Sequence, residues 1–188
     1  MSKKLPIPGI DYWPDEKEWL TPKPEQPPLF SQAFLFILVF ACLQLGWLMQ
    51  RDHDLGHFIR GEITVKPAVM LINLLSPHVH AVAFGNQIIA SGGGLVIKLG
   101  CEGLEVFFIL VAAIASSSLS ISSMLKATLA GVIYIYLLNQ ARILILFYTN
   151  RTDKALFHLL HTSIAPMVMI ALVGLFFHCC LKIQQSSN

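Results

Sequence analysis

Hydrophobic residues occur along this chain in long, nearly unbroken runs that short polar segments separate. The runs cover residues 29–49, 102–115, 124–148 and 157–181. A helix needs about 20 apolar residues to cross the hydrocarbon core of a bilayer. The pattern therefore predicts membrane-spanning helices, with a Ser-rich turn at residues 116–120 and a short polar loop at residues 149–154.

Two segments between the first and second runs have a different pattern. Residues 51–66 carry charges of both signs and predict a solvated connection, whereas residues 67–75 are apolar but too short to span and predict an amphipathic or partly inserted helix. In residues 82–99, short β-branched runs alternate with Gly-Asn and Ser-Gly-Gly-Gly, which predicts one or two hairpin strands. Open strand edges cannot face lipid, so we expect this segment outside the hydrocarbon or under protein cover.

The two ends of the chain are polar. Residues 1–28 are rich in proline, carry Trp13 and Trp19 as candidate interfacial anchors, and lack the pattern of a signal peptide, so we expect a retained tail. Residues 183–188 form a second polar tail. Between them, residues 29–182 are expected to form one membrane-embedded domain.

Composition supports this assignment. The chain has 188 residues, of which 55% are hydrophobic and 13% charged, whereas a soluble domain carries about 25% charged residues. We therefore expect an all-α polytopic membrane protein, a bundle of about four to six transmembrane helices with a strand-like segment before Cys101. The net charge of +2 gives no indication of nucleic-acid binding.

The charge distribution leaves the orientation open. With the Cys101 side outward, six basic residues lie inside: Lys3, Lys4, Lys17, Lys23, Lys126 and Lys182. Six others then lie outside: Arg51, Arg60, Lys66, Lys98, Arg151 and Lys154. The positive-inside rule does not choose between the two orientations.

Cys101 lies where a Gly-rich polar segment meets an apolar run. The other cysteines are Cys42, Cys179 and Cys180, and no C-x-x-C spacing indicates a zinc site or a redox pair. The start of a helix lowers the pKa of a thiol, while Glu102 and Glu105 raise it unless a cation neutralises them. The alternative is a small, buried and inert thiol.

Hydropathy places two further residues at the level of Cys101. Arg142 and His161 lie at nearly equal distances from the 149–154 loop, on the same side of the bundle as Cys101. An arginine inside a span costs roughly 2.5–3.5 kcal/mol and marks a candidate functional site. The alternatives are snorkelling or an ion pair with Glu105 for Arg142, and simple packing for His161. His158 shares much of the face of His161.

Residues 52–57 contain a possible metal-binding pattern: Asp52, His53, Asp54 and His57. No cysteine or third histidine completes a recognised spacing, which favours a solvated loop. We expect no metal and no cofactor.

Three short motifs resemble the exosortase/archaeosortase family of membrane transpeptidases. They are Cys101-x-Gly103, Asn139-x-x-Arg142 and a downstream histidine, here His161, and the resemblance extends over roughly residues 67–181. The spacing from Phe157 favours His161 over His158. Glu102 stands where many members have serine, and the chain is short for the family, which indicates a compact subgroup.

The resemblance implies a cysteine peptidase and transpeptidase that cleaves C-terminal sorting signals such as the PEP-CTERM tail. Cys101 would form a thioester, Arg142 would stabilise the thiolate or oxyanion, and His161 would protonate the leaving amine. Asn139 would orient Arg142, and Glu105 would pair with Arg142 or bind basic residues of the substrate.

The implied partners are substrate proteins that end in a motif, an apolar span and a basic tail, together with membrane lipids. The implied location is the inner membrane, with the active side extracytoplasmic. Two other classes remain as alternatives. A haem-binding redox subunit would use His158, His161 and His178, and a transport or assembly subunit would use Arg142 and Glu105 structurally.

Overall fold

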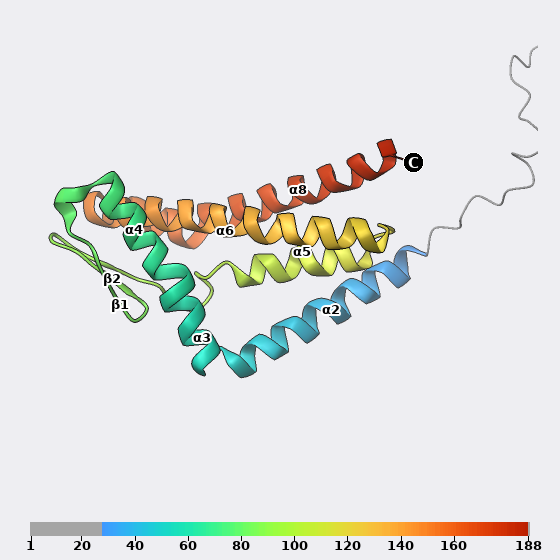
Figure 1. Ribbon diagram of the computed structural model, residues 1–188, viewed down its shortest axis with the longest axis horizontal. Coiled ribbons are helices and arrows are strands. Elements are labelled where there is room, and N and C mark those ends of the chain that lie inside the picture. Colours follow the sequence, from blue (N-terminus) through green and yellow to red (C-terminus); the bar gives the residue numbers. More distant parts are fainter. Residues whose placement is uncertain (1–27, 188) are drawn as a thin grey trace, which may run out of the picture.

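The structure, a computed structural model, describes residues 28–187, and most of this part of the chain is helical (Figure 1). Three helical segments in it are long and apolar enough to cross a membrane: Leu29–Gln50, Ile121–Thr152 and Lys154–Gln184. The predicted N-terminal tail, with Trp13 and Trp19, lies outside the described residues except for Pro28.

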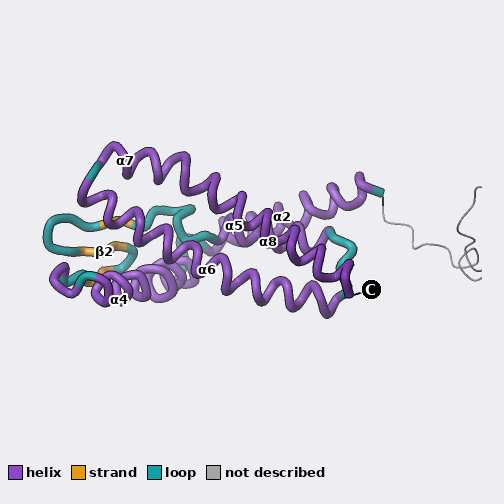
Figure 2. The backbone as a smooth tube through the Cα atoms, turned by 90° about the horizontal axis from the view of Figure 1, so that it is seen from above, coloured by secondary structure: helices purple, strands orange, loops and turns teal. Residues whose placement is uncertain are grey.

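Four helices form the elongated part of the molecule. Helices α5 (Leu104–Ser116), α6 (Ile121–Thr152) and α8 (Ala165–Ser187) pack against one another, and α2 (Leu29–Gln50) packs against α5 (Figures 1 and 2). The start of α2, the α5–α6 turn and the end of α8 all lie at one end of the molecule (Figure 1). The predicted Ser-rich turn is confirmed, and Ser120 caps α6 by accepting a hydrogen bond from the Ser123 amide at 3.3 Å.

Helix α5 is shorter than predicted. It begins at Leu104, so Glu102 precedes the helix, and it contains 13 residues. At 1.5 Å per residue it is about 20 Å long, against a hydrocarbon thickness of about 30 Å. The polar turn before α5 therefore lies close to the middle of α6 rather than at its end.

The segment predicted as a solvated connection is helical. Helices α3 (Asp54–Phe58), η1 (Ile59–Val65) and α4 (Lys66–Leu75) follow one another without a break (Figure 1). One face of this segment is buried, which explains why a charged stretch does not form a loop. The expected helix at residues 67–75 is confirmed.

Segment η1 is a π-helix, and Pro67 gives it a physical cause. Proline lacks an amide hydrogen, and its ring crowds the carbonyl four residues earlier, here that of Ile63. The widened turn lets the Lys66 amide donate to Gly61 instead. The side-chain amide of Gln140, on α6, donates to the Ile63 carbonyl at 3.5 Å and so supplies a partner from another helix.

A small antiparallel sheet follows α4 and the short η2 (Pro77–Val79). Its strands, in spatial order, are β1 (Val82–Phe84), β2 (Gln87–Ile89) and β3 (Leu95–Val96). The predicted hairpin strands are confirmed, with a third strand added. The sheet lies beside α4 at one end of the molecule (Figure 2). There Ile72, Ile88 and Phe147 are fully buried in a core formed by α4, the sheet and the last third of α6.

The polar loop predicted at residues 149–154 is wrong. Helix α6 continues to Thr152, and α7 (Lys154–Leu159) begins directly after Asp153, whose carboxylate accepts from the amides of Ala155 and Leu156 at 2.8 and 3.0 Å. A second π-helix, η3 (Leu160–Ile164), then leads into α8. Like η1 it ends two residues before a proline, here Pro166.

Candidate functional site

Cys101 lies in the tight turn that joins the sheet to α5. The Cys101 amide donates to the Lys98 carbonyl at 3.0 Å, and glycines with positive φ flank it at Gly100 and Gly103. The Cys101 side chain is buried, with the residue 7% exposed, in the core shared by α4, the sheet and α6. The thiol therefore lies between the strand end of the molecule and the helical bundle.

Arg142 reaches this thiol from the middle of α6. Its Nη2 lies 3.9 Å from Cys101 Sγ, although 41 residues separate them in sequence. The structure thus brings together the two residues that hydropathy places at one level. The Arg142 Nε is buried without a hydrogen-bond partner among the described residues.

Asn139 lies one helical turn before Arg142 and packs against Gly103. A Cβ atom at Gly103 would lie 3.1 Å from Asn139 Cγ, so only glycine fits there without displacement. Gly103 also has φ 83°, a conformation that side chains disfavour. The Cys-x-Gly and Asn-x-x-Arg motifs are therefore in direct contact, because the Asn139 side chain packs against the backbone of Gly103.

His161 lies on η3, which packs beside this region. Its ring stacks on Phe157 with centroids 5.5 Å apart, and Phe157 packs against the core that contains Cys101. The His161 Nδ1 is buried without a hydrogen-bond partner, and no hydrogen bond joins His161 to Cys101 or Arg142 within residues 28–187. His158 is exposed and accepts a hydrogen bond from Thr162 at its carbonyl.

The carboxylates of the turn are arranged differently from the prediction. Glu105 is exposed and forms no ion pair with Arg142 in the described part of the chain, so the structure does not show the pairing that was one of the two alternatives for Glu105. Glu102 is the buried carboxylate, and it faces Arg60 of η1 with Nη1 and Oε1 3.5 Å apart. Arg60 is not among the predicted site residues, because it lies in residues 51–66, whose mixed charges predict a solvated connection.

Burial raises the pKa of the Cys101 thiol above its ordinary value. The Arg142 guanidinium lowers this pKa, whereas Glu102 raises it, and burial prevails. The start of a helix favours a thiolate only within its first turn. Cys101 lies two residues before Gly103, the N-cap of α5, and so precedes that turn.

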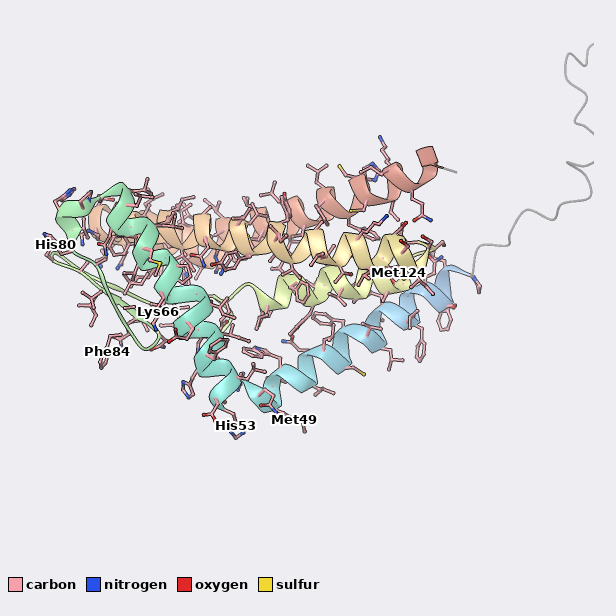
Figure 3. The ribbon with its side chains drawn as sticks, in the orientation of Figure 1. Met49, His53, Lys66, His80, Phe84 and Met124 are labelled. Carbon is pink, nitrogen blue, oxygen red and sulfur yellow. The ribbon has the colours of Figure 1, made fainter. Side chains whose placement is uncertain are left out.

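The candidate metal ligands do not form a cluster. Within residues 28–187, no three His, Cys, Asp or Glu side chains are grouped closely enough to hold a metal ion. His53 lies at the corner between α2 and α3, next to Met49 (Figure 3). Asp52 instead pairs with the neighbouring Arg51 at 3.4 Å on the surface.

Comparisons with known proteins give no independent assignment. No family model matches the chain, and neither the curated proteins nor the solved structures contain a significant match. The resemblance to exosortases therefore rests on the three short motifs.

Proposed function

We propose that this chain is a membrane-embedded cysteine transpeptidase of the exosortase type, which cleaves C-terminal sorting signals and transfers the processed protein through a thioester. The observation that carries the proposal is the position of the Arg142 guanidinium, 3.9 Å from the Cys101 thiol inside a buried core. A fixed cation in a low-dielectric site stabilises a thiolate and an oxyanion far more than it would in water.

The proposed location is the inner membrane, with α2, α5, α6 and the α7–α8 segment crossing it. Three of these four segments are long and apolar enough to do so. Many large apolar side chains on α2 and α8 are exposed, as lipid-facing helices require. The end of the molecule that carries the β1–β3 sheet faces the extracytoplasmic side, where sorting-signal substrates are cleaved. Cys101 and Arg142 lie where this end joins the helical bundle.

The proposed reaction has two steps. The Cys101 thiolate attacks the carbonyl carbon of the scissile peptide bond, while Arg142 stabilises the negative oxygen that forms. The carbon–nitrogen bond then breaks, and His161 gives a proton to the leaving amine. The nucleophile of an acceptor, after losing its proton to His161, attacks the thioester and releases Cys101.

The rival classes have weaker support. His158, His161 and His178 all lie on the α7–α8 segment, so they do not provide haem ligands from two facing helices. One structural role considered for Arg142 was an ion pair with Glu105, and that pair is absent from the part of the chain described here. A non-enzymatic subunit in which Arg142 only packs is the alternative that the experiment must exclude.

The test is processing of a sorting-signal substrate by co-expressed variants. Cys101→Ala is expected to abolish processing at normal membrane levels, because a methyl group cannot form a thioester. The matched control is the double variant Cys179→Ala/Cys180→Ala, which should retain activity. Inactivity of the control together with an active Cys101→Ala would refute the assignment of the nucleophile.

The same assay separates catalysis from packing at Arg142. Arg142→Lys keeps the charge but loses the planar two-donor geometry, so we expect at least a ~100-fold loss, the scale for removing one oxyanion donor. His161→Ala should resemble it, whereas the exposed His158 should tolerate alanine. Near-normal processing by Arg142→Lys would return Arg142 to a structural role.

A further inference from the structure

Arg60 and Glu102 form the most deeply buried ion pair among the described residues. The side chain of Arg60 is 8% exposed and that of Glu102 is 1% exposed. The two come from different elements, since Arg60 lies on η1 and Glu102 in the turn before α5. The pair therefore links the α3–α4 segment to the turn that carries Cys101.

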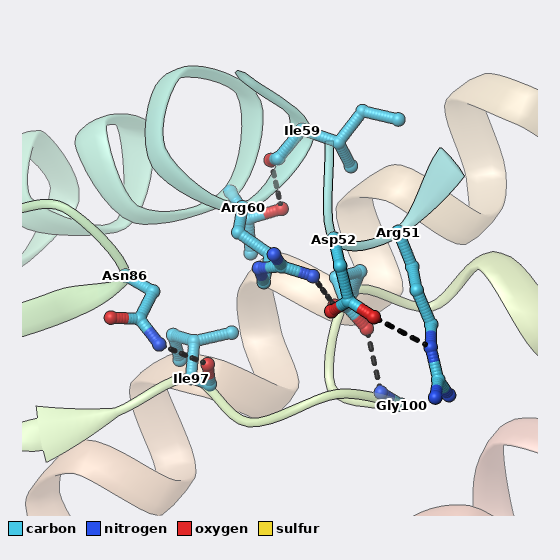
Figure 4. Close-up of polar contacts among 9 residues, drawn as sticks. Arg51, Asp52, Ile59, Arg60, Asn86, Ile97 and Gly100 are labelled. Atoms are coloured by element: carbon cyan, nitrogen blue, oxygen red, sulfur yellow. Dashed lines mark hydrogen bonds and ion pairs between the residues drawn. The ribbon is translucent and has the colours of Figure 1, made fainter. Parts of the chain in front are cut away.

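Glu102 also holds the turn itself. Its Oε2 accepts a hydrogen bond from the Gly100 amide at 2.7 Å, while its Oε1 faces Arg60 Nη1 at 3.5 Å. The dashed lines at Arg60 and Gly100 in Figure 4 mark these two contacts. The Glu102 carboxylate thus binds the backbone on the other side of Cys101. The same carboxylate forms an ion pair with the Arg60 guanidinium, which comes from a different element.

A buried carboxylate beside a thiol opposes ionisation of that thiol unless a cation balances it. Glu102 acts on Cys101 in this direction. Arg142 is the cation that contacts the sulfur, and Arg60 is the cation that contacts Glu102. The two arginines therefore have separate partners, and each balances a different negative charge.

We propose that Arg60 is a positioning residue for Cys101, which through Glu102 fixes the Gly100–Gly103 turn and neutralises the carboxylate next to the thiol. The inference deepens the proposed function, since it rests on Cys101 acting as the nucleophile. Glu102 directly follows Cys101 and would by itself disfavour the thiolate. The positive charge of Arg60 on the preceding helical segment offsets this effect.

Ionisable groups from several elements lie around the Cys101 turn. Arg142 on α6 contacts the sulfur, and Glu102 on the same turn pairs with Arg60 of η1. Glu105 at the start of α5 lies near Gly100, and His161 on η3 lies on the side of Arg142 and Lys98. Only Glu102 among the carboxylates is buried with the thiol, because Glu105 is exposed. Removing either member of the Arg60–Glu102 pair therefore changes the net charge beside the thiol.

The test measures the pH dependence of Cys101 alkylation by iodoacetamide, in a background with the other three cysteines changed to alanine. Arg60→Met should move the midpoint of the profile to higher pH and slow alkylation at pH 8 at least about threefold, because Glu102 loses its counter-charge. Glu102→Gln should move the midpoint to lower pH. The double variant Arg60→Met/Glu102→Gln should lie close to the parent.

The matched control is Arg51→Met, which removes an arginine from an exposed pair with Asp52 and should leave the midpoint unchanged. An unchanged midpoint in both Arg60→Met and Glu102→Gln would overturn the proposal and leave Arg60 a structural residue. If Arg60→Met does not fold, Glu102→Gln decides alone, since its predicted shift needs no other variant. Alkylation does not depend on a substrate, so failure of the proposed transpeptidase function would appear separately as full processing by Cys101→Ala.

Discussion

At the scale of single residues, the site depends on close contacts that leave no room for ordinary side chains. A Cβ atom at Gly103 would lie 3.1 Å from Asn139 Cγ, so a larger residue there would displace Asn139. Gly103 also has a φ of 83°, in the left-handed region that favours glycine. This contact places α5 against α6 beside Cys101. The glycine of the Cys-x-Gly motif is thus needed for packing, whatever reaction the cysteine performs.

Gly103→Ala is therefore expected to destabilise the protein more than Gly100→Ala. Both glycines have positive φ, near 83° and 86°, so alanine costs roughly 1–2 kcal/mol at either position. At Gly100 the nearest atom to a new Cβ is a Glu105 oxygen at 3.6 Å, an ordinary contact, so only Gly103 adds a clash. Thermal unfolding in detergent measures the difference, and equal losses would show that the Asn139 contact is unimportant.

At the scale of secondary structure, both π-helices occur two residues before a proline and both carry a residue of the site. Arg60 lies on η1 and His161 on η3. A π-turn changes which residues face the neighbouring helices and leaves carbonyl groups free for other donors. In η1 the free carbonyl of Ile63 receives the Gln140 side chain from α6.

Gln140→Leu should therefore destabilise the protein by about 1–3 kcal/mol, because the Ile63 carbonyl and the neighbouring Thr64 carbonyl lose the donor that the buried Gln140 side chain supplies. The loss should be smaller in a Pro67→Ala background, since residue 67 then offers an amide hydrogen to Ile63. A double-mutant cycle on thermal or denaturant unfolding measures this coupling. Additive effects of the two changes would mean that Pro67 is not the cause of the free carbonyl.

The elements that sequence reasoning found are those with local signals. The apolar runs predicted the long helices, and the Gly-Asn and Ser-Gly-Gly-Gly spacers predicted the strands before Cys101, which the structure contains. The contact between Cys101 and Arg142 followed from counting residues along helices. These features depend on the pattern of the chain rather than on its detailed packing.

The elements that it missed depend on tertiary packing. Nothing local shows that Arg60 is buried, because its neighbours carry mixed charges that are equally typical of a surface loop. The signal that could have found it is the proline at position 67, which can follow a π-turn within a helix. A loop was predicted at residues 149–154, but only Asp153 separates α6 from α7. The Asp153 carboxylate caps α7, and one capping residue is enough to start a new helix.

At the scale of the whole molecule, the turns separate into two groups. The α5–α6 turn, the start of α2 and the end of α8 lie at one end, and the α6–α7 turn and the sheet lie at the other (Figures 1 and 2). Asp153 is the residue between α6 and α7. If the helices cross a membrane, residues at the two ends must face opposite compartments. This division follows from the arrangement of the helices and does not depend on the count of basic residues.

A cysteine introduced at Asp153, and another at Ser118, should therefore label from opposite sides of the membrane. Both positions are exposed, so a membrane-impermeant maleimide can reach them in a cysteine-free background. Asp153→Cys should react from the extracytoplasmic side, and Ser118→Cys only after the membrane is permeabilised. The reverse pattern would place the Cys101 side in the cytoplasm and refute the proposed sorting function.

The length of α6 also determines how far Cys101 lies from the opposite end of the helical bundle. Arg142 lies 21 residues after α6 begins at Ile121, a rise of about 31 Å, which matches the hydrocarbon thickness of about 30 Å. If α6 enters the hydrocarbon at Ile121, the thiol that Arg142 contacts lies at the level where, under the proposed function, a substrate's own transmembrane helix would leave the lipid. A peptide bond next to that helix can meet Cys101 without pulling the helix out of the membrane, whereas a bond many residues away would have to fold back. Distance from the bilayer then acts as a selection criterion in its own right, alongside whatever sequence the site prefers.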